Sequence, residues 1–470
     1  MNTKDLIFLG VPAGEPIQHA HDFIQRYIAD GNDGAQLGEE IFQIVADPSA
    51  YLSDDLRGPL ARALEDHRRD ACAPFIPRAE LAPWRQWGDD LEADAVRQMK
   101  NSCALPVAVA GALMPDAHPG YGLPIGGVLA TENAVIPYAV GVDIACRMKL
   151  TVYDRKANII AGQRDRLANI IEEETRFGIG CTFKARRNHD VMDDDWTVSP
   201  VTRRLRDKAW TQLGTSGSGN HFVEFGSFKV TNEKLGLPDG EYLALLSHSG
   251  SRGTGAQVCD VYSKRAMARR SNLPKELKHL AWLTLDQEDG QEYWNAMNLM
   301  GRYAAANHEL IHKHIAKKLG ARVILDIENH HNFAWKERHV VNGHERELIV
   351  HRKGATPAGK GVLGIIPGSM ASPGFVVRGK GQPESLNSAS HGAGRVMSRS
   401  KALQSFTWSG TKKLLAANGV ELLSAGLDEV PGVYKDIHTV MAAQSDLVEV
   451  LGRFDPKLVK MCPPGERAED

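Results

Sequence analysis

Metal-ligating side chains occur in four separate, mostly glycine-containing segments of the sequence. GVDIACRM carries Asp143 and Cys146, GSGNHF carries His221, LLSHSG carries His248 and DIENHHNF carries His331. Each segment alone is at least as typical of a buried structural residue. Together the carboxylate, thiolate and three imidazoles predict a site for two divalent ions that share a bridging thiolate, although these ligands suit zinc as well as other borderline metals. Two such ions activate a nucleophile and neutralise phosphoryl oxygens.

A fifth segment, SHGAGRVMSR, offers a nucleophile. His391 is flanked by small residues, so it is open to attack a phosphorus atom, and imidazole acts as a covalent nucleophile when its other nitrogen is held by a partner. The following glycines let backbone N–H groups approach phosphate oxygens, and Arg395 and Arg399 supply positive charge. A buried turn histidine is the alternative.

Two further glycine-rich segments are candidates for anion contacts. The run from Gly214 to Gly219 favours either an anion cradle or a flexible turn. HRKGATPAGKG places Arg352 and Lys353 on an expected loop, either against a polyphosphate or RNA or in solvent. Neither a P-loop nor a dinucleotide-binding glycine motif is present, nor the motif of lysine-dependent nucleotidyl transferases.

The composition fits an ordinary globular protein. The formal net charge of −2 gives no overall attraction to nucleic acid, so RNA contacts would need local basic patches. Six scattered cysteines without a CxxC favour a reducing cytoplasm over a disulfide scaffold. No secretion signal is visible and no run reaches about 18 apolar residues, so we expect neither secretion nor a membrane span.

The elements that must position these residues mix helices with short strands. Residues 1–95 show helical apolar spacing and predict a helical, variable extension; helices are also expected at 262–282 and 290–319. Between them lie short β-branched runs and Gly- and Pro-rich turns. We therefore predict an α+β fold with a single large catalytic domain over 96–461, mixed sheets, a loop-built metal and nucleotide cleft, and a frayed tail at 462–470.

The ordered segments resemble the RtcB ligase family. The matching runs are MPDAHPGYGLPIGGV, GVDIAC, GSGNHFVE, SHSGSRGTG, HHNFA, HRKGAT, PGSM and SHGAGR, which span residues 114–399, with a weaker match to about 461. The resemblance implies an RNA ligase that uses GTP and two Mn²⁺ ions. It would join a 2′,3′-cyclic phosphate or 3′-phosphate end to a 5′-hydroxyl end, through GMP on His391 and then an RNA–ppG end.

The resemblance also implies residue roles. One manganese would be held by Asp143, Cys146 and His221, and the other by Cys146, His248 and His331. Arg252 and Arg399 would face RNA phosphates, and Asp116 and His118 would either support the site or face RNA. The GMP pocket would be formed by Asn220, His221, Phe222, Val223, Glu224, His331, Asn332, Pro367, Gly368, Ser369, Met370, His391, Gly392, Ala393, Gly394 and Lys460.

Departures from the family pattern bear on the substrate. Arg147 follows the metal cysteine where the family has glycine, and Gly374 stands where a serine contacts GTP. They favour a divergent branch that acts in RNA repair, on broken tRNA or rRNA, beside the tRNA-splicing alternative. The candidate protein partners are an archease-like activator and a release-factor-like protein. The alternatives are a guanylyltransferase that caps 3′-phosphate ends of RNA or DNA, and a non-catalytic RNA-end-binding protein.

Overall fold

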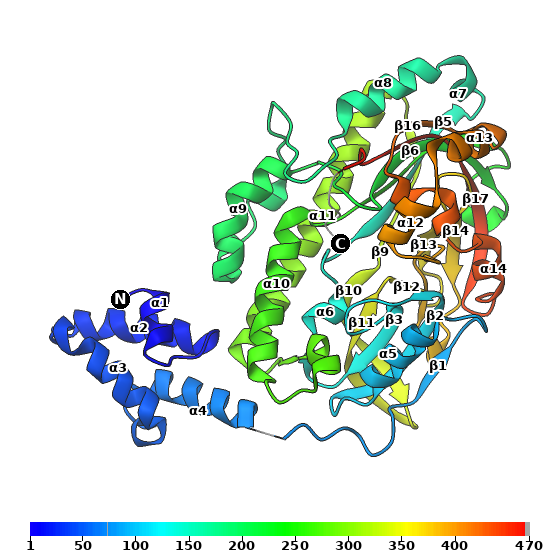
Figure 1. Ribbon diagram of the computed structural model, residues 1–470. Coiled ribbons are helices and arrows are strands. Elements are labelled where there is room, and N and C mark those ends of the chain that lie inside the picture. Colours follow the sequence, from blue (N-terminus) through cyan, green and yellow to red (C-terminus); the bar gives the residue numbers. More distant parts are fainter. Residues whose placement is uncertain (73, 466–470) are drawn as a thin grey trace.

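The computed structural model describes residues 1–72 and 74–465 (Figure 1). Its largest element is an eight-stranded sheet in the order β13-β14-β17-β6-β7-β5-β9, with β16 paired to β17. The strands are β5 (Arg147–Lys156), β6 (Phe222–Val230), β7 (Glu241–Ser249), β9 (Val323–His330), β13 (Leu363–Ile366), β14 (Gly374–Gly379), β16 (Glu421–Ser424) and β17 (Val448–Met461). All its pairs are antiparallel except β16 with β17, so the sheet is mixed, as predicted.

A five-stranded sheet, in the order β1-β2-β3-β11-β10, forms the second layer of strands. Its strands are β1 (Trp84–Gln86), β2 (Ala108–His118), β3 (Ile125–Thr131), β10 (Asn332–Val341) and β11 (His344–Lys353). Helix α5 (Ala93–Cys103) packs on β2, and β1 pairs with β2 in parallel. His331 is the single residue between β9 and β10, so it lies where the chain leaves one sheet for the other.

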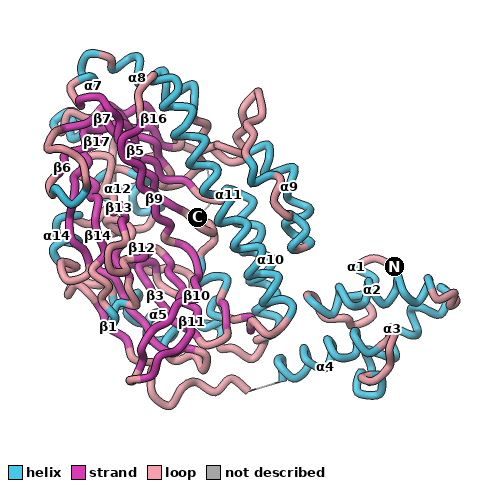
Figure 2. The backbone as a smooth tube through the Cα atoms, turned by 180° about the vertical axis from the view of Figure 1, so that it is seen from behind, coloured by secondary structure: helices cyan, strands magenta, loops and turns pink. Residues whose placement is uncertain are grey.

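Long helices cover one side of the sheets (Figure 2). They are α9 (Pro200–Gln212), α10 (Arg252–Arg269) and α11 (Glu288–Leu319), and they share an apolar core that includes Tyr262, Tyr293 and Tyr303. Helix α11 starts with two acidic residues and ends at Gly320, whose φ of +66° terminates the helix. The helix predicted at 290–319 is confirmed by α11. The helix predicted at 262–282 is shifted toward the N-terminus, because the observed helix α10 begins ten residues earlier, inside a glycine-rich run, and ends at Arg269.

The N-terminal helices form a separate cluster with its own core, beside α10 (Figures 1 and 2). They are α1 (Thr3–Phe8), α2 (Glu15–Ala29), α3 (Leu37–Ala46) and α4 (Gly58–Cys72). The buried Arg269 of α10 ties them to the rest of the chain, since it makes ion pairs with Glu15 and Asp70 as well as with Asp289 of α11. Of the predicted extension at 1–95, the described helices reach Cys72, and residues 84–86 join the five-stranded sheet.

Short elements complete the fold. The helices are α6 (Pro137–Val140), α7 (Ile159–Gly162), α8 (Arg164–Glu174), α12 (Arg399–Ser405), α13 (Trp408–Ala417) and α14 (Ile437–Ala442); the strands are β4 (Ala134–Val135), β8 (Leu283–Thr284), β12 (Ala355–Pro357) and β15 (Ser388–Ser390). Of the predicted tail, 466–470 lie outside the described residues, and Cys462 is buried rather than frayed. Among the described helices none is long and apolar enough to cross a membrane.

Candidate active site

The predicted metal ligands meet at one end of the eight-stranded sheet. Strand β5 lies between β7 and β9, and β6 pairs with the other edge of β7. The register places His248, near the end of β7, opposite both Met148 and Phe222, the latter being the first residue of β6. Cys146 and His221 therefore immediately precede their strands at the same end where His331 follows β9.

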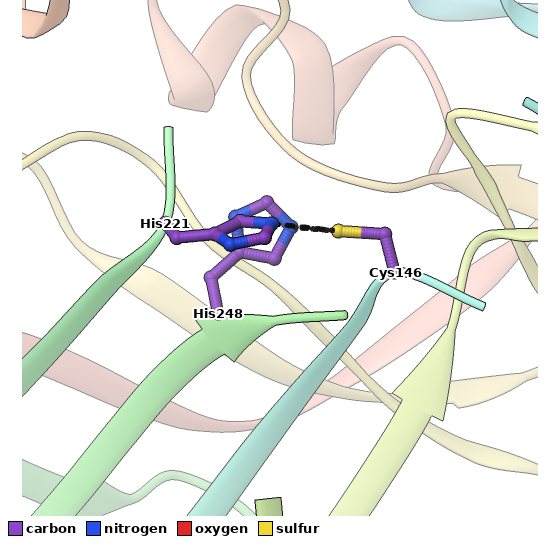
Figure 3. A group of neighbouring side chains, drawn as sticks. All are labelled: Cys146, His221 and His248. Atoms are coloured by element: carbon purple, nitrogen blue, oxygen red, sulfur yellow. Dashed lines mark hydrogen bonds between the residues drawn. The ribbon is translucent and has the colours of Figure 1, made fainter. Parts of the chain in front are cut away.

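The donor atoms of these side chains face one another. The Cys146 sulfur lies 3.0 Å from His248 Nε2 and 3.4 Å from His221 Nε2 (Figure 3). His221 Nε2 lies 3.1 Å from Asp143 Oδ2, and His248 Nε2 lies 3.2 Å from His331 Nε2. Donors that share one ion at bonds of about 2.0–2.3 Å lie roughly 3.0–3.7 Å apart. The spacing thus fits metal ions among these five residues, with the thiolate central.

Backbone carbonyls orient two of the imidazoles. His221 Nδ1 lies 2.9 Å from the Ser216 carbonyl and His248 Nδ1 lies 3.1 Å from that of Asn220. A proton held on Nδ1 in this way leaves the Nε2 lone pair directed at the thiolate, as a metal ligand requires. Burial, with the neighbouring His221, lowers the pKa of His248 to about 3, so its ring is neutral.

Asp143 is fixed by one of its two oxygens. Oδ1 accepts hydrogen bonds from the Ser251 N–H at 2.9 Å and the Ser251 hydroxyl at 3.1 Å, which leaves Oδ2 facing His221. Burial acts to raise the pKa of Asp143, but the His221 and Arg252 side chains and the Ser251 N–H outweigh it and the pKa is lowered. Only glycine fits at position 250, because a Cβ there would lie 2.0 Å from Oδ2.

A cavity of about 490 Å³ joins this cluster to the other predicted residues. Its lining includes Asp143, Cys146, Asn220, Phe222, Glu224, His248, His331, Asn332, Pro367, Gly368, Ser369, Met370, His391, Gly392, Ala393, Gly394 and Arg399. Glu224 is buried in its wall, and burial raises the pKa of its carboxyl well above the usual range. The tertiary structure therefore gathers most of the predicted metal, nucleotide and nucleophile residues around one space.

His391 lies in this cavity with its Nδ1 held by Asp116. The Nδ1 to Oδ2 distance is 2.7 Å, and the same oxygen accepts the backbone N–H groups of His391 at 3.1 Å and Gly392 at 3.3 Å. Burial acts to raise the pKa of Asp116, but the His391 ring, with smaller contributions from His118 and Lys435, outweighs it and lowers that pKa. An ionised Asp116 that accepts from Nδ1–H leaves Nε2 unprotonated, which is the form of a nucleophile.

His391 is also next to the metal ligands, since its ring centroid lies 5.0 Å from that of His331. Asp116 is fully buried, which favours the supporting role over the RNA-facing one. His118 lines the cavity, and its Nδ1 lies 3.1 Å from the Asp116 carbonyl. Burial lowers the pKa of His118 to about 4.

Some predicted residues point elsewhere. Val223 and Lys460 pair across β6 and β17 with their side chains on the face away from the cavity, because Glu224 and Val459 occupy the cavity face. Val223 packs in the apolar core, and the Lys460 amine makes an ion pair with Glu172. The Lys460 side chain is therefore turned away from the cavity in which the resemblance would place its guanine contact.

The predicted RNA-facing arginines differ from expectation. Arg252 is 1% exposed, and its guanidinium bonds to Thr215 at 3.1 Å and to the Gly178 carbonyl, so it holds the loop before His221 instead of facing RNA. Arg352 is likewise buried and paired with Glu337, since it ends a central strand rather than lying on a loop. Arg399 lines the cavity while paired with Asp428 and Glu429.

Three residues that sequence reasoning passed over also line the cavity. Glu429 and Tyr434 lie in a segment with no recognisable motif, and Tyr121 lies within PGYGLP, whose only signal in the sequence is its resemblance to the family. Gly217 had a visible signal: with φ of +106° and a Cβ position 2.3 Å from His221 Nδ1, it must be glycine. Its place in a glycine-rich run predicted a loop, but the sequence did not show that the His221 ring requires glycine at this position.

A histidine with a buried carboxylate partner lies beside clustered thiolate, carboxylate and imidazole groups in one cavity, an arrangement compatible with metal-assisted group transfer. The family model described as tRNA-splicing ligase RtcB matches residues 98–461. The chain belongs to the RtcB family of RNA ligases.

The curated relatives agree over most of their length. The chain is 34% identical over 411 residues to the RNA-splicing ligase RtcB of Escherichia coli K12, covering 79% of this chain and 95% of the relative. It is 30% identical to the tRNA-splicing ligase RtcB of Methanococcus maripaludis, covering 80% and 92%. The corresponding protein of Thermococcus kodakarensis is 28% identical, covering 82% and 95%.

Proposed function

We propose that the protein is a GTP- and Mn²⁺-dependent ligase that joins RNA ends bearing a 2′,3′-cyclic phosphate or 3′-phosphate to 5′-hydroxyl ends, through a GMP–His391 intermediate. The observation that carries the proposal is the contact between Asp116 and His391, which leaves the other ring nitrogen free to act as a nucleophile in the cavity lined by four of the five proposed metal ligands.

The first step follows from the state of the two side chains. His391 Nε2 attacks the α-phosphorus of GTP; a P–N bond forms, the bond to the pyrophosphate oxygen breaks, and pyrophosphate leaves with its electron pair. The Nδ1 proton stays in the hydrogen bond to Asp116, whose negative charge stabilises the positive charge that grows on the ring. A 2′,3′-cyclic phosphate end is first hydrolysed: water adds to phosphorus, the bond to the 2′-oxygen breaks, and a 3′-phosphate and a 2′-hydroxyl result. In the second step a 3′-phosphate oxygen displaces the imidazole from the GMP phosphorus, which restores neutral His391 and gives an RNA–ppG end.

Two metal ions fit the donor set. One would be held by Asp143, Cys146 and His221, and the other by Cys146, His248 and His331. Bound ions supply positive charge to phosphoryl oxygens in an in-line displacement. Mn²⁺ is inferred from the family, since the donors themselves would also suit zinc.

The proposed GMP pocket is the part of the cavity on the eight-stranded sheet. Glu224 and Phe222 of β6 form its wall, and the turns at 367–370 and 392–394 offer backbone groups close to His391. A protonated Glu224, favoured by its burial, would both donate to and accept from a guanine edge. The 5′-hydroxyl of the second RNA end would then attack the activated phosphorus and release GMP.

Incubation with α-³²P-labelled GTP and Mn²⁺ tests the proposal. The parent protein should become labelled, His391→Ala should not, and His344→Ala, an exposed histidine on the β11 hairpin, should label like the parent. Equal labelling of His391→Ala and the parent would contradict the assignment.

Capping is the second candidate reaction for the same site. A labelled 3′-phosphate RNA, offered with and without a 5′-hydroxyl partner, separates the two: ligation gives a joined strand, whereas capping leaves a stable guanylylated end. We propose sealing because the chain matches almost the whole of its ligase relatives. We further propose a cytoplasmic role on broken tRNA or rRNA, with an archease-like or release-factor-like protein as the candidate partner; ligation of a nicked anticodon loop and a cut rRNA hairpin compares these substrates.

A further inference from the structure

Three aromatic side chains form a group at the rim of the cavity. Tyr121 lies on the loop between β2 and β3, Tyr138 in α6, and His279 in the 3-10 helix η6 (Lys275–Leu280). Their ring centroids are 5.5 Å apart for Tyr121 and His279, 6.4 Å for Tyr121 and Tyr138, and 4.7 Å for Tyr138 and His279. Tyr121 both lines the cavity and is 65% exposed, so a large part of its ring faces solvent at the entrance.

The loop that carries Tyr121 is fastened on both sides. The Gly120 N–H donates to Gln98 Oε1 at 3.0 Å, and the Gln98 amide donates back to the Gly120 carbonyl. At Gly122, a Cβ would lie 2.7 Å from the His279 carbonyl oxygen, so the loop lies directly on η6. The exposed ring is therefore held in place before any ligand arrives, which reduces the entropy cost of stacking on it.

Positive charge connects this group to the nucleophile. The Lys353 amine donates to the Tyr121 carbonyl at 2.6 Å and lines the cavity. Burial lowers the pKa of Lys353 to about 8, which leaves it mostly protonated at neutral pH. The next residue, Gly354, approaches His391 so closely that a Cβ on it would lie 3.2 Å from the ring. The exposed Lys278 adds a second cation beside His279.

We propose that Tyr121, supported by Tyr138 and His279, is a stacking platform for an unpaired base of the RNA strand that enters the cavity, with Lys353 against a neighbouring phosphate. The inference rests on the proposed function, because it takes RNA as the substrate. Proteins that hold single strands combine aromatic rings on which bases stack with nearby positive charge. The combination here, and its continuity with the cavity of His391, favour a nucleotide over an apolar segment of a partner protein.

The position also fits a two-substrate reaction. Glu224 and Phe222 belong to the eight-stranded sheet, whereas Tyr121 extends from the five-stranded sheet, and all three line the cavity that contains His391. A base on Tyr121 would therefore leave the proposed guanine pocket open to GMP.

Binding measured without GTP tests the platform. The probe is a fluorescein-labelled single-stranded RNA of about ten nucleotides with a 3′-phosphate, and the readout is the dissociation constant from fluorescence anisotropy. We expect Tyr121→Ala to weaken binding about tenfold, in line with the loss of one stacked base, and Tyr121→Phe to bind like the parent because it keeps the ring. Phe8→Ala, which removes a 91% exposed ring on α1, is the matched control and should bind like the parent.

A blunt duplex of the same sequence distinguishes stacking from a general effect on structure. It offers no unpaired base, so Tyr121→Ala should bind the duplex as the parent does. Parent-like binding of the single strand by both Tyr121→Ala and His279→Ala, or equal losses for single strand and duplex, would overturn the proposal and favour a protein-binding face. The ligase proposal is tested separately by the labelling experiment with GTP. If that proposal is wrong, GTP will not label the parent protein.

Discussion

Replacing Asp116 by Asn tests the link between geometry and chemistry most directly. Three donors converge on Oδ2 of this carboxylate: Nδ1 of His391 and the backbone N–H groups of His391 and Gly392. Oδ1 is buried with no hydrogen-bond partner among the described residues. The amide oxygen of Asn can replace Oδ2 and its NH₂ group can take the place of Oδ1, so the fold should tolerate the change while the negative charge is lost.

The magnitude follows from that charge. A hydrogen bond to an ionised group contributes about 1.5–3 kcal/mol, against about 0.5–1.5 kcal/mol for a neutral pair. The midpoints of these ranges differ by about 1.25 kcal/mol, and losing that much stabilisation of the growing imidazolium corresponds to roughly an eightfold lower rate. If the amide instead turns its NH₂ group toward Nδ1, the ring proton moves to Nε2 and blocks the nucleophile. In the histidine–aspartate pair of serine proteases the same change lowers the rate about 10⁴-fold.

The assay is single-turnover labelling of the protein by α-³²P-labelled GTP at saturating Mn²⁺. Asp446→Asn is the matched control, because this exposed carboxylate accepts a hydrogen bond from the buried Trp87 indole N–H and should not affect the rate. Labelling of Asp116→Asn at the parent rate would refute the argument that Asp116 activates His391.

The remaining predictions concern the metal cluster and the nucleotide wall. Cys146→Ala should lose most of its bound manganese in metal analysis, because one thiolate serves both proposed ions. The control variant Cys103→Ala should keep its manganese. Two ions at full occupancy in Cys146→Ala would disprove the bridging role of the thiolate. Gly250→Ala should lower metal affinity and the melting temperature, because its Cβ would lie 2.0 Å from an Asp143 oxygen; unchanged metal binding would count against that contact. Glu224→Gln should raise the melting temperature of the metal-free protein at pH 7. Burial raises the pKa of the Glu224 carboxyl in the folded protein, so ionisation of this group destabilises the fold at pH values above its unfolded pKa of about 4.3. Below that pH the carboxyl is neutral in both states, and the difference in melting temperature between variant and parent should vanish. A difference that does not change with pH would exclude this cause.

Local chemistry made the candidate metal ligands predictable from the sequence. Few side-chain types bind divalent metal ions well, so a thiolate, a carboxylate or an imidazole in a short glycine-rich segment could be recognised as a candidate. In the structure the five predicted ligands lie together. Helix α11 could be predicted for a similar reason, since its pattern, its acidic start and Gly320 are all local.

Burial and strand alternation could not be predicted in the same way. Arg252 looked like an RNA contact, but the first turn of α10 buries it against the 214–219 loop. Lys460 looked like a guanine contact, but the register of β17 against β6 turns it toward Glu172. A shift of one residue in a strand reverses the face of every side chain, and no turn joins β6 to β17 to set their register locally.

The sequence by itself therefore predicted which residues are candidates to bind metal and which histidine is the candidate nucleophile. Only the tertiary structure decided that a carboxylate holds the His391 ring, because its partner, Asp116, lies 275 residues earlier in the chain. It also decided that Tyr121, Tyr138 and His279 form one group at the entrance, since they come from three elements that become neighbours only when the loop after β2, α6 and η6 pack together. Contacts between distant segments depend on packing of the whole chain, which residue type and spacing do not encode locally.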